Sequence, residues 1–253
     1  MKYYKDLAQI GVFTIEDVVN ITGNRYRADK AVSSLIKNGE IHRIKRNLYA
    51  AVNMSTLDDY PNRFEIASRI TDTSFVSYHS AFEFYACYNQ VFYEVQVSSI
   101  KGFQPFLYNE YDYLSFETNS LKQVELINGT KVSSMERTIV DSINMLGKVM
   151  DVEELVKCID LVSYIDEDKI KEMLLEYDKD ILYRKVGYVL SFFKDSLRIS
   201  DSFFDFCNVH SNRYNIGYLS YGEVKSLEFI SEWGLYAYKD LMHIIDKGGM
   251  ADV

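Results

Sequence analysis

Two short amphipathic helices are predicted near the start of the chain, within residues 14–39. Thr14 precedes a run of apolar residues at helical spacing and Asp17 follows three residues later, so we expect a hydroxyl N-cap with an acid in the first turn. Gly23 can adopt the left-handed conformation that ends a helix. The hydrophobic pattern therefore predicts that the chain turns at Gly23 and starts a second helix at once.

The second predicted helix, over NRYRADKAVSSLIKNG, has two different faces. At roughly 100° per residue, small and branched apolar residues share one face. These inward residues are Ala28, Ala31, Val32 and Leu35. The opposite face carries cations, hydroxyls and one aromatic ring, which suit the phosphate oxygens and base edges of DNA. Its members are Tyr26, Arg27, Lys30, Ser33, Ser34 and Lys37.

A basic β-hairpin is predicted directly after this helix. Gly39 ends the helix, and the segment EIHRIKRNLYAA places a cationic turn between two short β-prone runs, with Asn47 able to take a positive φ at the tip. Three cations of this hairpin are expected to hold the flanking DNA backbone: Arg43, Lys45 and Arg46. With a first helix over residues 3–10, this order is typical of a winged helix-turn-helix, which we assign to residues 1–55.

The charge is unevenly distributed along the chain. The net charge of −9 argues by itself against nucleic acid as a partner. Residues 1–55, however, hold nine Lys or Arg against five Asp or Glu, giving +4, whereas the remainder holds 19 against 32, giving −13. A cationic helix face is also an ordinary solvated face, but a basic head on an acidic body favours DNA binding by the head. The eleven acids of residues 151–180 suit solvent or a basic protein partner.

The rest of the chain is predicted to be a larger mixed α/β domain, so the fold class is α+β. A polar stretch with Pro61 marks a linker over residues 56–62, before a C-terminal domain over residues 63–253. We expect helices at 62–70 and 78–85, then strands at 91–99, 103–118 and 122–132, with Asn128-Gly129 at a tight hairpin. From about residue 133 the pattern is helical, at 133–146, 151–162, 167–177 and 181–197.

The segment SSMERTIVDSINML shows the clearest helix start in this second domain. Ser133 and Glu136 have the spacing of a capping box, and Arg137 and Asp141 that of a surface ion pair one turn apart. The apolar stripe of this helix consists of Ile139, Val140, Ile143 and Leu146. We therefore expect an amphipathic helix with one face in the core.

Motifs that would indicate an enzyme are absent from the sequence. No nucleophile elbow, phosphate-binding loop or dinucleotide-binding glycine pattern occurs, and the four histidines lack zinc-site spacing. Asp112 and Glu117 could serve a metal-dependent nuclease, but Asn119 stands where the lysine of that motif belongs, so both are interpreted as surface carboxylates. His79, between Ser77 and Ser80 at a helix start, is interpreted as a capping or packing residue. No catalytic residue, cofactor or metal ligand is assigned.

The cysteines and the N-terminus indicate a compartment. Cys87, Cys158 and Cys207 are widely spaced and odd in number, as expected for reduced core residues of a cytoplasmic protein. The first residues, MKYYKDLAQIGVF, lack the apolar run of a signal peptide, and no stretch reaches 18 apolar residues. A soluble protein without a membrane partner is expected.

The chain resembles the AbiEi family, the antitoxins of type IV (AbiE) toxin-antitoxin and abortive infection systems. FTIEDVVNITGNRYRADKAVSSLIKNGEIHRIKRNLYA is similar to the family's winged helix-turn-helix. FVSYHSAFEFYACYNQVFYEVQVSS is similar to its "S-H-x-S-A-L" helix and following strand, and SSMERTIVDSI to its "S-P-E-R" helix start. Three positions depart from the family pattern, with Asn47 and Ala86 where Gly is usual and Met135 where Pro is usual.

The resemblance implies a non-enzymatic protein with two tasks. The winged domain would bind inverted repeats in operator DNA and repress its own operon, and the C-terminal domain would counter a co-encoded nucleotidyltransferase toxin, without a stable complex being required. An alternative is a winged-helix transcription regulator whose C-terminal domain senses a ligand or a protein and has no toxin partner. A nucleotidyltransferase reading frame directly downstream would favour the antitoxin.

Overall fold

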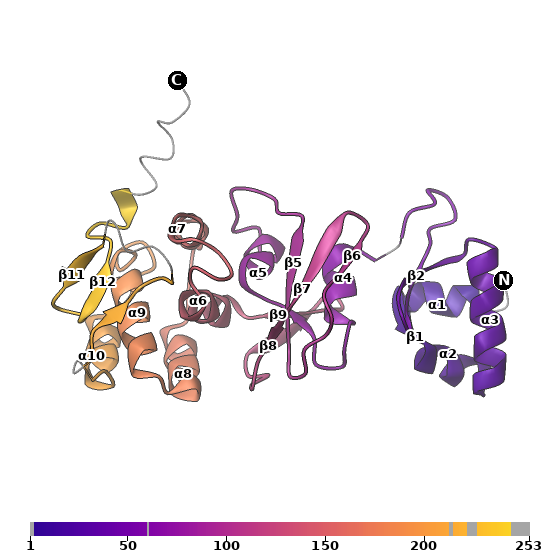
Figure 1. Ribbon diagram of the computed structural model, residues 1–253, viewed down its shortest axis with the longest axis horizontal. Helices are drawn as coiled ribbons and strands as arrows, with labels where there is room; N and C mark the ends of the chain where they lie inside the picture. The colour runs from indigo at the N-terminus through magenta and orange to yellow at the C-terminus, as the bar shows by residue number, and fades with distance from the viewer. Residues whose placement is uncertain (1–2, 60, 213–214, 222–226, 244–253) are drawn as a thin grey trace, which may run out of the picture. The chain divides into compact units, whose positions relative to one another are not determined.

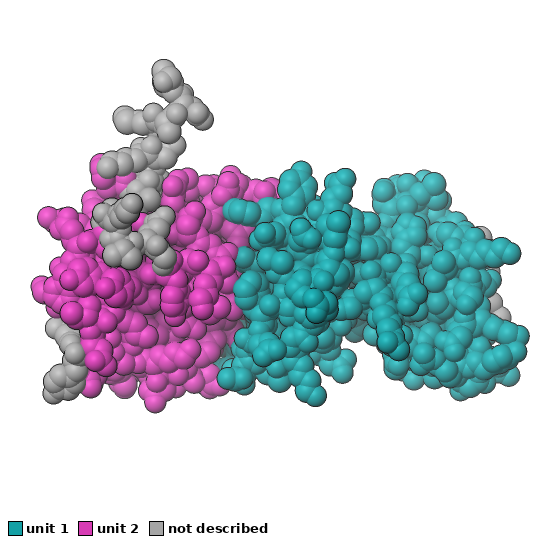
Figure 2. Space-filling model, viewed as in Figure 1, with its two compact units in different colours: residues 1–76, 92–132 teal, residues 77–91, 133–253 magenta. Residues whose placement is uncertain are grey.

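The computed structural model describes residues 3–59, 61–212, 215–221 and 227–243, which form a mixed α+β fold. The chain divides into two compact units, coloured separately in Figure 2. Unit 1 consists of residues 1–76 and 92–132, and unit 2 of residues 77–91 and 133–253. The predicted linker at 56–62 lies inside unit 1, so a separate domain over residues 1–55 stays a prediction.

The N-terminal part of unit 1 contains three helices and a small sheet (Figure 1). In chain order these are α1 (Tyr4–Ile10), β1 (Val12–Thr14), α2 (Ile15–Thr22), α3 (Arg25–Lys37), β2 (Ile41–Lys45) and β3 (Leu48–Ala51). The strands form an antiparallel sheet in the order β1-β3-β2. The helices and the hairpin occur where the sequence predicted them, whereas β1 was not predicted.

Local caps explain why α2 and α3 begin and end where they do. The backbone N–H of Thr14 donates to the Asp17 carboxylate at 2.7 Å, and the backbone N–H of Asp17 donates to the Thr14 hydroxyl at 3.3 Å. Gly23 has a φ of 89°, and the Asn24 side chain then caps α3 by accepting from a backbone N–H of its first turn. These contacts confirm the predicted cap and glycine turn.

A separate apolar core holds these elements together. Its buried members are Leu7, Phe13, Ile15, Val18, Ala28, Val32, Leu35, Ile41, Tyr49 and Ala51. Three of the four residues predicted on the inward face of α3 belong to it, and the fourth, Ala31, is half-buried against it. Because this face is turned inward, the opposite face of α3 is exposed to solvent.

The remainder of unit 1 is a six-stranded mixed sheet with one helix packed on it. Its elements are α4 (Arg63–Ser68), β4 (Phe75–Val76), β5 (Glu94–Ser99), β6 (Phe106–Tyr108), β7 (Tyr111–Glu117), β8 (Val124–Ile127) and β9 (Thr130–Ser133). The strand order is β6-β7-β5-β4-β9-β8, with β5 parallel to β7 and β4 parallel to β9. Asn128 and Gly129 both have positive φ, which confirms the tight hairpin predicted there.

Unit 2 is rich in helices. It contains α5 (Tyr78–Phe84), α6 (Met135–Asn144), α7 (Val152–Asp160), α8 (Glu167–Tyr177), α9 (Asp180–Ser191), α10 (Asp201–Val209), β10 (Gly217–Tyr218), β11 (Glu228–Ile230) and β12 (Leu235–Ala237). The three strands form a small sheet in the order β10-β12-β11. The helix-rich pattern predicted after about residue 133 is therefore confirmed, but it did not include these three short strands, and the helix predicted at 181–197 ends at Ser191.

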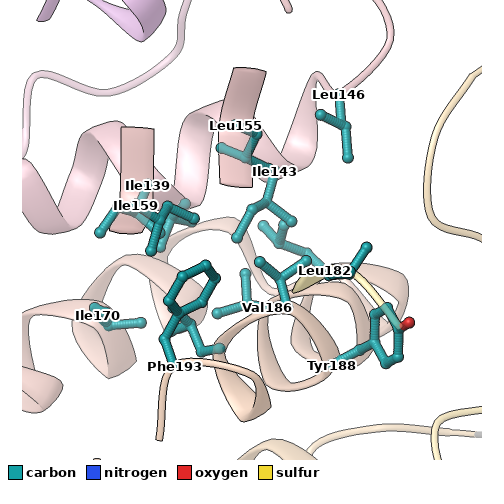
Figure 3. Close-up of a cluster of buried hydrophobic side chains, with 14 of the residues drawn as sticks. Ile139, Ile143, Leu146, Leu155, Ile159, Ile170, Leu182, Val186, Tyr188 and Phe193 are labelled. Atoms are coloured by element: carbon teal, nitrogen blue, oxygen red, sulfur yellow. The ribbon is translucent and has the colours of Figure 1, made fainter. Parts of the chain in front are cut away.

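The core of unit 2 gathers side chains from its helices α5 to α10 and from strand β12. Figure 3 shows Ile139 and Ile143 of α6, Leu155 and Ile159 of α7, Ile170 of α8 and Leu182 and Val186 of α9 around a common centre. Gly187 of α9 lies directly against the buried ring of Trp233, and a Cβ at this position would overlap that ring. This close approach requires glycine.

The start of α6 differs from the sequence prediction. Ser134 is the N-cap, and its hydroxyl accepts a hydrogen bond from the Arg137 backbone N–H at 3.2 Å. Glu136 accepts from the backbone N–H of Asp166 at 3.0 Å. The predicted capping box of Ser133 with Glu136 is therefore wrong by one residue at the cap.

The ion pair in α6 lies in the core and not on the surface as predicted. Arg137 Nε is 3.0 Å from Asp141 Oδ2, and the two side chains are 0% and 6% exposed. The Tyr177 hydroxyl of α8 donates a further hydrogen bond to the Asp141 carboxylate. The spacing of the pair was predicted correctly, but α6 packs against α7, α8 and α9, and a spacing along one helix does not encode what covers it.

Candidate nucleic-acid interface

The cationic face of α3 and the β2–β3 hairpin form the candidate interface. Eight of the nine predicted side chains are exposed: Tyr26, Arg27, Lys30, Ser33, Ser34, Lys37, Arg43 and Arg46. Lys45 is half-buried. The fold of residues 24–47 therefore brings cations from two adjacent elements to the solvent, as a surface that contacts phosphates requires.

Lys30 and Tyr26 form a pair on this face. The Lys30 ammonium lies 4.5 Å from the centroid of the Tyr26 ring, which is 67% exposed. A cation over an aromatic ring is attracted to its negative face, by roughly 0.5–1 kcal/mol at an exposed site. The pair limits the freedom of Lys30 before any partner binds, and Tyr26 contributes an apolar surface beside it.

The two serines of the face differ in their hydrogen bonds. The Ser33 hydroxyl donates to the Asp29 backbone carbonyl at 2.8 Å, so its proton is used within the helix and its lone pairs stay available to a donor. Ser34 has no such bond within the described part of the chain. Ser34 is therefore the better placed of the two to donate to a phosphate oxygen.

Two acids modify the charge of this face in a way that the sequence analysis did not predict. Arg25 Nε lies 3.1 Å from Asp29 Oδ1, and Arg25 is also 3.8 Å from Glu16 of α2. These side chains are between 57% and 67% exposed. Arg25 is thus neutralised locally, which leaves Arg27, Lys30 and Lys37 as the cations of α3 that lack a carboxylate contact in the described residues.

The Lys45 side chain is more buried than the sequence predicted. Its ammonium lies 5.0 Å from the Phe103 ring centroid and 4.7 Å from that of Phe106. Burial lowers the pKa of Lys45 below its ordinary value. The register of the hairpin shifts between Arg43 and Lys45, and this bulge separates the exposed Arg43 from the half-buried Lys45. Lys45 therefore serves to anchor the hairpin.

A buried carboxylate also ties the hairpin to the rest of unit 1. Asp59 Oδ1 lies 2.9 Å from His42 Nδ1 of β2, and Asp59 Oδ2 accepts from the Tyr108 hydroxyl at 2.6 Å and the Asn109 amide at 2.8 Å. Only 5% of the Asp59 side chain is exposed. Burial and the Asp59 carboxylate both raise the pKa of Tyr108. No sequence signal indicated this network, whose members come from three separate segments.

Other titratable residues considered in the sequence take different positions. Asp112 and Glu117 are exposed on β7, which agrees with surface carboxylates. Cys87, Cys158 and Cys207 are free thiols, and Cys87 is only half-buried. His79 is buried in unit 2, where its Nε2 lies 2.9 Å from Glu154 Oε1. The sequence reading did not place Glu154 beside His79.

Comparisons with known proteins give a likeness of fold. No protein-family model and no curated protein matches this chain. The crystal structure of the RV2827C protein from Mycobacterium tuberculosis is similar, with a TM-score of 0.63 and 12% sequence identity over 98% of this chain and 94% of that chain. Within the described residues, every helix is too short or too polar to span a bilayer.

Proposed function

We propose that residues 1–55 form a winged helix-turn-helix that binds operator DNA, in a protein that acts as an antitoxin and autorepressor of a type IV toxin-antitoxin operon. The observation that carries the DNA-binding part is the solvent face of α3. Arg27, Lys30 and Lys37 are exposed there without carboxylate contacts in the described residues, and the β2–β3 hairpin adds Arg43 of β2 and Arg46 of its turn.

The exposure of α3 as a single helix supports DNA binding. A single exposed helix fits the major groove of B-DNA, where side chains of its outer face can meet base edges. In this proposal Arg27, Lys30, Ser33, Ser34 and Lys37 face the groove with Tyr26 at its edge. Arg43 and Arg46 contact the flanking backbone, while Lys45 supports the hairpin from within.

The antitoxin part rests on the resemblance to the AbiEi family, and two backbone conformations support it. Asn47 and Ala86 stand where that family usually has glycine, and their φ values are 64° and 60°. Positive φ is the conformation that favours glycine at such a position. In this proposal unit 2 counters a nucleotidyltransferase toxin encoded in the same operon.

The DNA-binding proposal is tested on base-reading residues of α3. We expect Arg27→Ala and Lys30→Ala each to weaken binding to DNA from upstream of the operon by roughly 1–3 kcal/mol, measured by fluorescence anisotropy. Lys5→Ala is the matched control, because it removes one exposed cation of α1 from the same basic region. Unchanged affinity in both α3 variants would overturn the placement of this helix in the groove.

The contact of the hairpin turn with DNA is tested by salt. Each phosphate contact contributes about 0.9 to the slope of log affinity against log salt concentration. We expect Arg46→Ala to reduce that slope by about one such contact at an unchanged preference for the operator sequence. A slope identical to that of the wild-type protein would mean that the turn does not contact the backbone.

The two tasks are separated by co-expression with the downstream gene. An Arg27→Ala, Lys30→Ala double variant should lose repression of an operon reporter and still protect cells from the toxin. Loss of both activities would contradict a division of labour between the α3 face and unit 2. Absence of toxicity from the downstream gene would contradict the antitoxin itself.

A ligand-sensing regulator is the second candidate, and one feature of unit 2 favours it. A cavity of about 420 Å³ is lined by Asn144, Lys185, Ser220 and Tyr221 together with apolar side chains. Lys185 is 5% exposed and has no carboxylate contact in the described residues. An anionic small molecule in this cavity would supply its counter-charge, and operator binding that changes with such a ligand would favour this candidate.

A further inference from the structure

Three potential metal ligands meet between α5 and α7 of unit 2. His79 Nε2 lies 2.9 Å from Glu154 Oε1, and Cys158 Sγ lies 3.4 Å from the same oxygen. The ligand atoms of the three residues all lie within 4.8 Å of one another. Their exposures are 3%, 5% and 0%, so they form a compact buried cluster.

The cluster contains a buried carboxylate without a Lys or Arg contact in the described residues. The side-chain partners of Glu154 are His79, Cys158 and the Gln90 amide, which donates to Oε2 at 2.9 Å. A carboxylate removed from water needs a compensating positive charge. Two sources could supply this charge in direct contact with Glu154, namely a protonated His79 or a bound cation.

The donor set favours a transition metal over the proton. Imidazole nitrogen, thiolate sulfur and carboxylate oxygen are the ligands that zinc uses in proteins. Glu154 and Cys158 are four residues apart on α7, a spacing that puts both side chains on one face of a helix, and His79 approaches from α5. Two anionic ligands and one neutral imidazole would neutralise a divalent ion.

We propose that His79, Glu154 and Cys158 bind one Zn²⁺ ion, which joins α5 to α7. Cys87 lies outside this group of three ligands. It is half-buried, and its Sγ lies 3.7 Å from the carbonyl oxygen of Leu161, the residue that follows α7. The exposed Gln90 lies at the same cluster and marks its side towards solvent. This site is independent of the proposed DNA-binding function.

Sequence spacing could not indicate this site. His79 and Glu154 are 75 positions apart, and the pair on α7 has the pattern E-x-x-x-C, which belongs to no common zinc motif. The interpretation of His79 as a packing residue and of the cysteines as core residues followed from that spacing. The ligands become neighbours only when α5 packs on the helices of unit 2.

The experiment is metal loading of the full-length protein. Protein freed of metal with a chelator is titrated with Co²⁺, which gives a thiolate-to-metal charge-transfer absorption only when sulfur is a ligand. We expect one Co²⁺ per chain with this band, its displacement by one equivalent of Zn²⁺, and one Zn²⁺ per chain by elemental analysis of protein loaded with Zn²⁺.

Matched variants assign the ligands. Cys158→Ser and His79→Ala should weaken Zn²⁺ binding at least about 100-fold, and Cys158→Ser should remove most of the charge-transfer band. Cys207→Ser is the control, because Cys207 is equally buried in unit 2 but outside the cluster. Cys87→Ser should leave Zn²⁺ binding nearly unchanged, because Cys87 lies outside the group of three ligands.

Two outcomes would overturn the proposal. Wild-type protein that takes up no Co²⁺ or Zn²⁺ above the level of nonspecific binding would leave the protonated histidine as the counter-charge, and nitrogen NMR would then show both His79 ring nitrogens protonated. Stoichiometric binding that survives Cys158→Ser and His79→Ala would place the metal elsewhere. The titration of the wild-type protein can exclude the site by itself. The proposal therefore stays testable even if one of the variants does not fold.

Discussion

Two Arg–Asp pairs at the same helical spacing lie in opposite environments. Arg25 and Asp29 of α3 are 3.1 Å apart with side chains 58% and 57% exposed. Arg137 and Asp141 of α6 are 3.0 Å apart with side chains 0% and 6% exposed. The geometry of the two pairs is nearly equal, so their different consequences come from what surrounds them.

The two pairs contribute differently to stability because one is in water and the other is in the core. In water, an exposed pair four residues apart contributes about 0.3–0.5 kcal/mol to stability and is weakened by salt. In the core, each charge has lost its hydration and depends on its partner and on added hydrogen bonds, such as that from Tyr177. The exposed pair therefore adjusts the charge of a surface, whereas the buried pair is a requirement for packing α6.

Breaking the buried pair is expected to have the largest effect. Asp141→Asn keeps the shape of the side chain but removes the negative charge that lies 3.0 Å from the buried Arg137 guanidinium, and we expect a loss of about 3–5 kcal/mol in the free energy of unfolding. Urea denaturation followed by circular dichroism measures this loss. A loss below about 1 kcal/mol would show that packing α6 does not require the Asp141 carboxylate and would remove the contrast with α3.

Lys185 provides an intermediate case, because it is a buried cation without a carboxylate contact in the described residues. Burial lowers its pKa from 10.5 to about 8. Replacing it by Met removes the cost of burying this charge, so Lys185→Met should stabilise the protein at pH 7 by about 2 kcal/mol.

The pH dependence of this variant has a defined sign. Between about pH 8 and pH 10.5 the unfolded chain binds more protons at Lys185 than the folded chain, so the wild-type protein gains stability as the pH rises. The advantage of Lys185→Met is therefore complete below about pH 8 and shrinks above it. An advantage that is constant up to pH 10.5 would mean that folding does not lower the pKa of Lys185, so that its charge is compensated in the folded state.

Breaking the exposed pair is expected to have the smallest effect on stability. Asp29→Asn should change the free energy of unfolding by less than about 0.5 kcal/mol. If the proposed DNA contact of α3 is correct, the same change should strengthen DNA binding a few-fold, because it removes an acid from the cationic face and releases Arg25. Weaker binding in Asp29→Asn would indicate that Asp29 positions Arg25 for the contact.

Local signals allowed the N-terminal elements to be predicted. The cap at Thr14, the glycine turn at Gly23 and the hairpin tip at Asn47 each depend on residues within a few positions, and each is present. The exposed face of α3 followed from its periodicity. The three-residue strand β1 and the two- and three-residue strands β10–β12 were missed, because so few residues give no periodic pattern.

Contacts between distant segments could not be predicted. The half-burial of Lys45 depends on Phe103 and Phe106, which lie on another part of the chain. The burial of Arg137 and the meeting of His79 with Glu154 depend likewise on helices that pack only after folding. Periodicity indicates which face of an element is apolar, but not which polar residue of another segment reaches it.

The close packing of Gly187 on Trp233 has a practical consequence for measurement. Trp233 is the only tryptophan of the chain, and it is buried in unit 2. Its emission therefore reports the melting of the helical unit without a label, while unit 1 stays silent at that wavelength. Comparing this emission with circular dichroism of the whole chain would reveal whether the two units unfold together or one after the other.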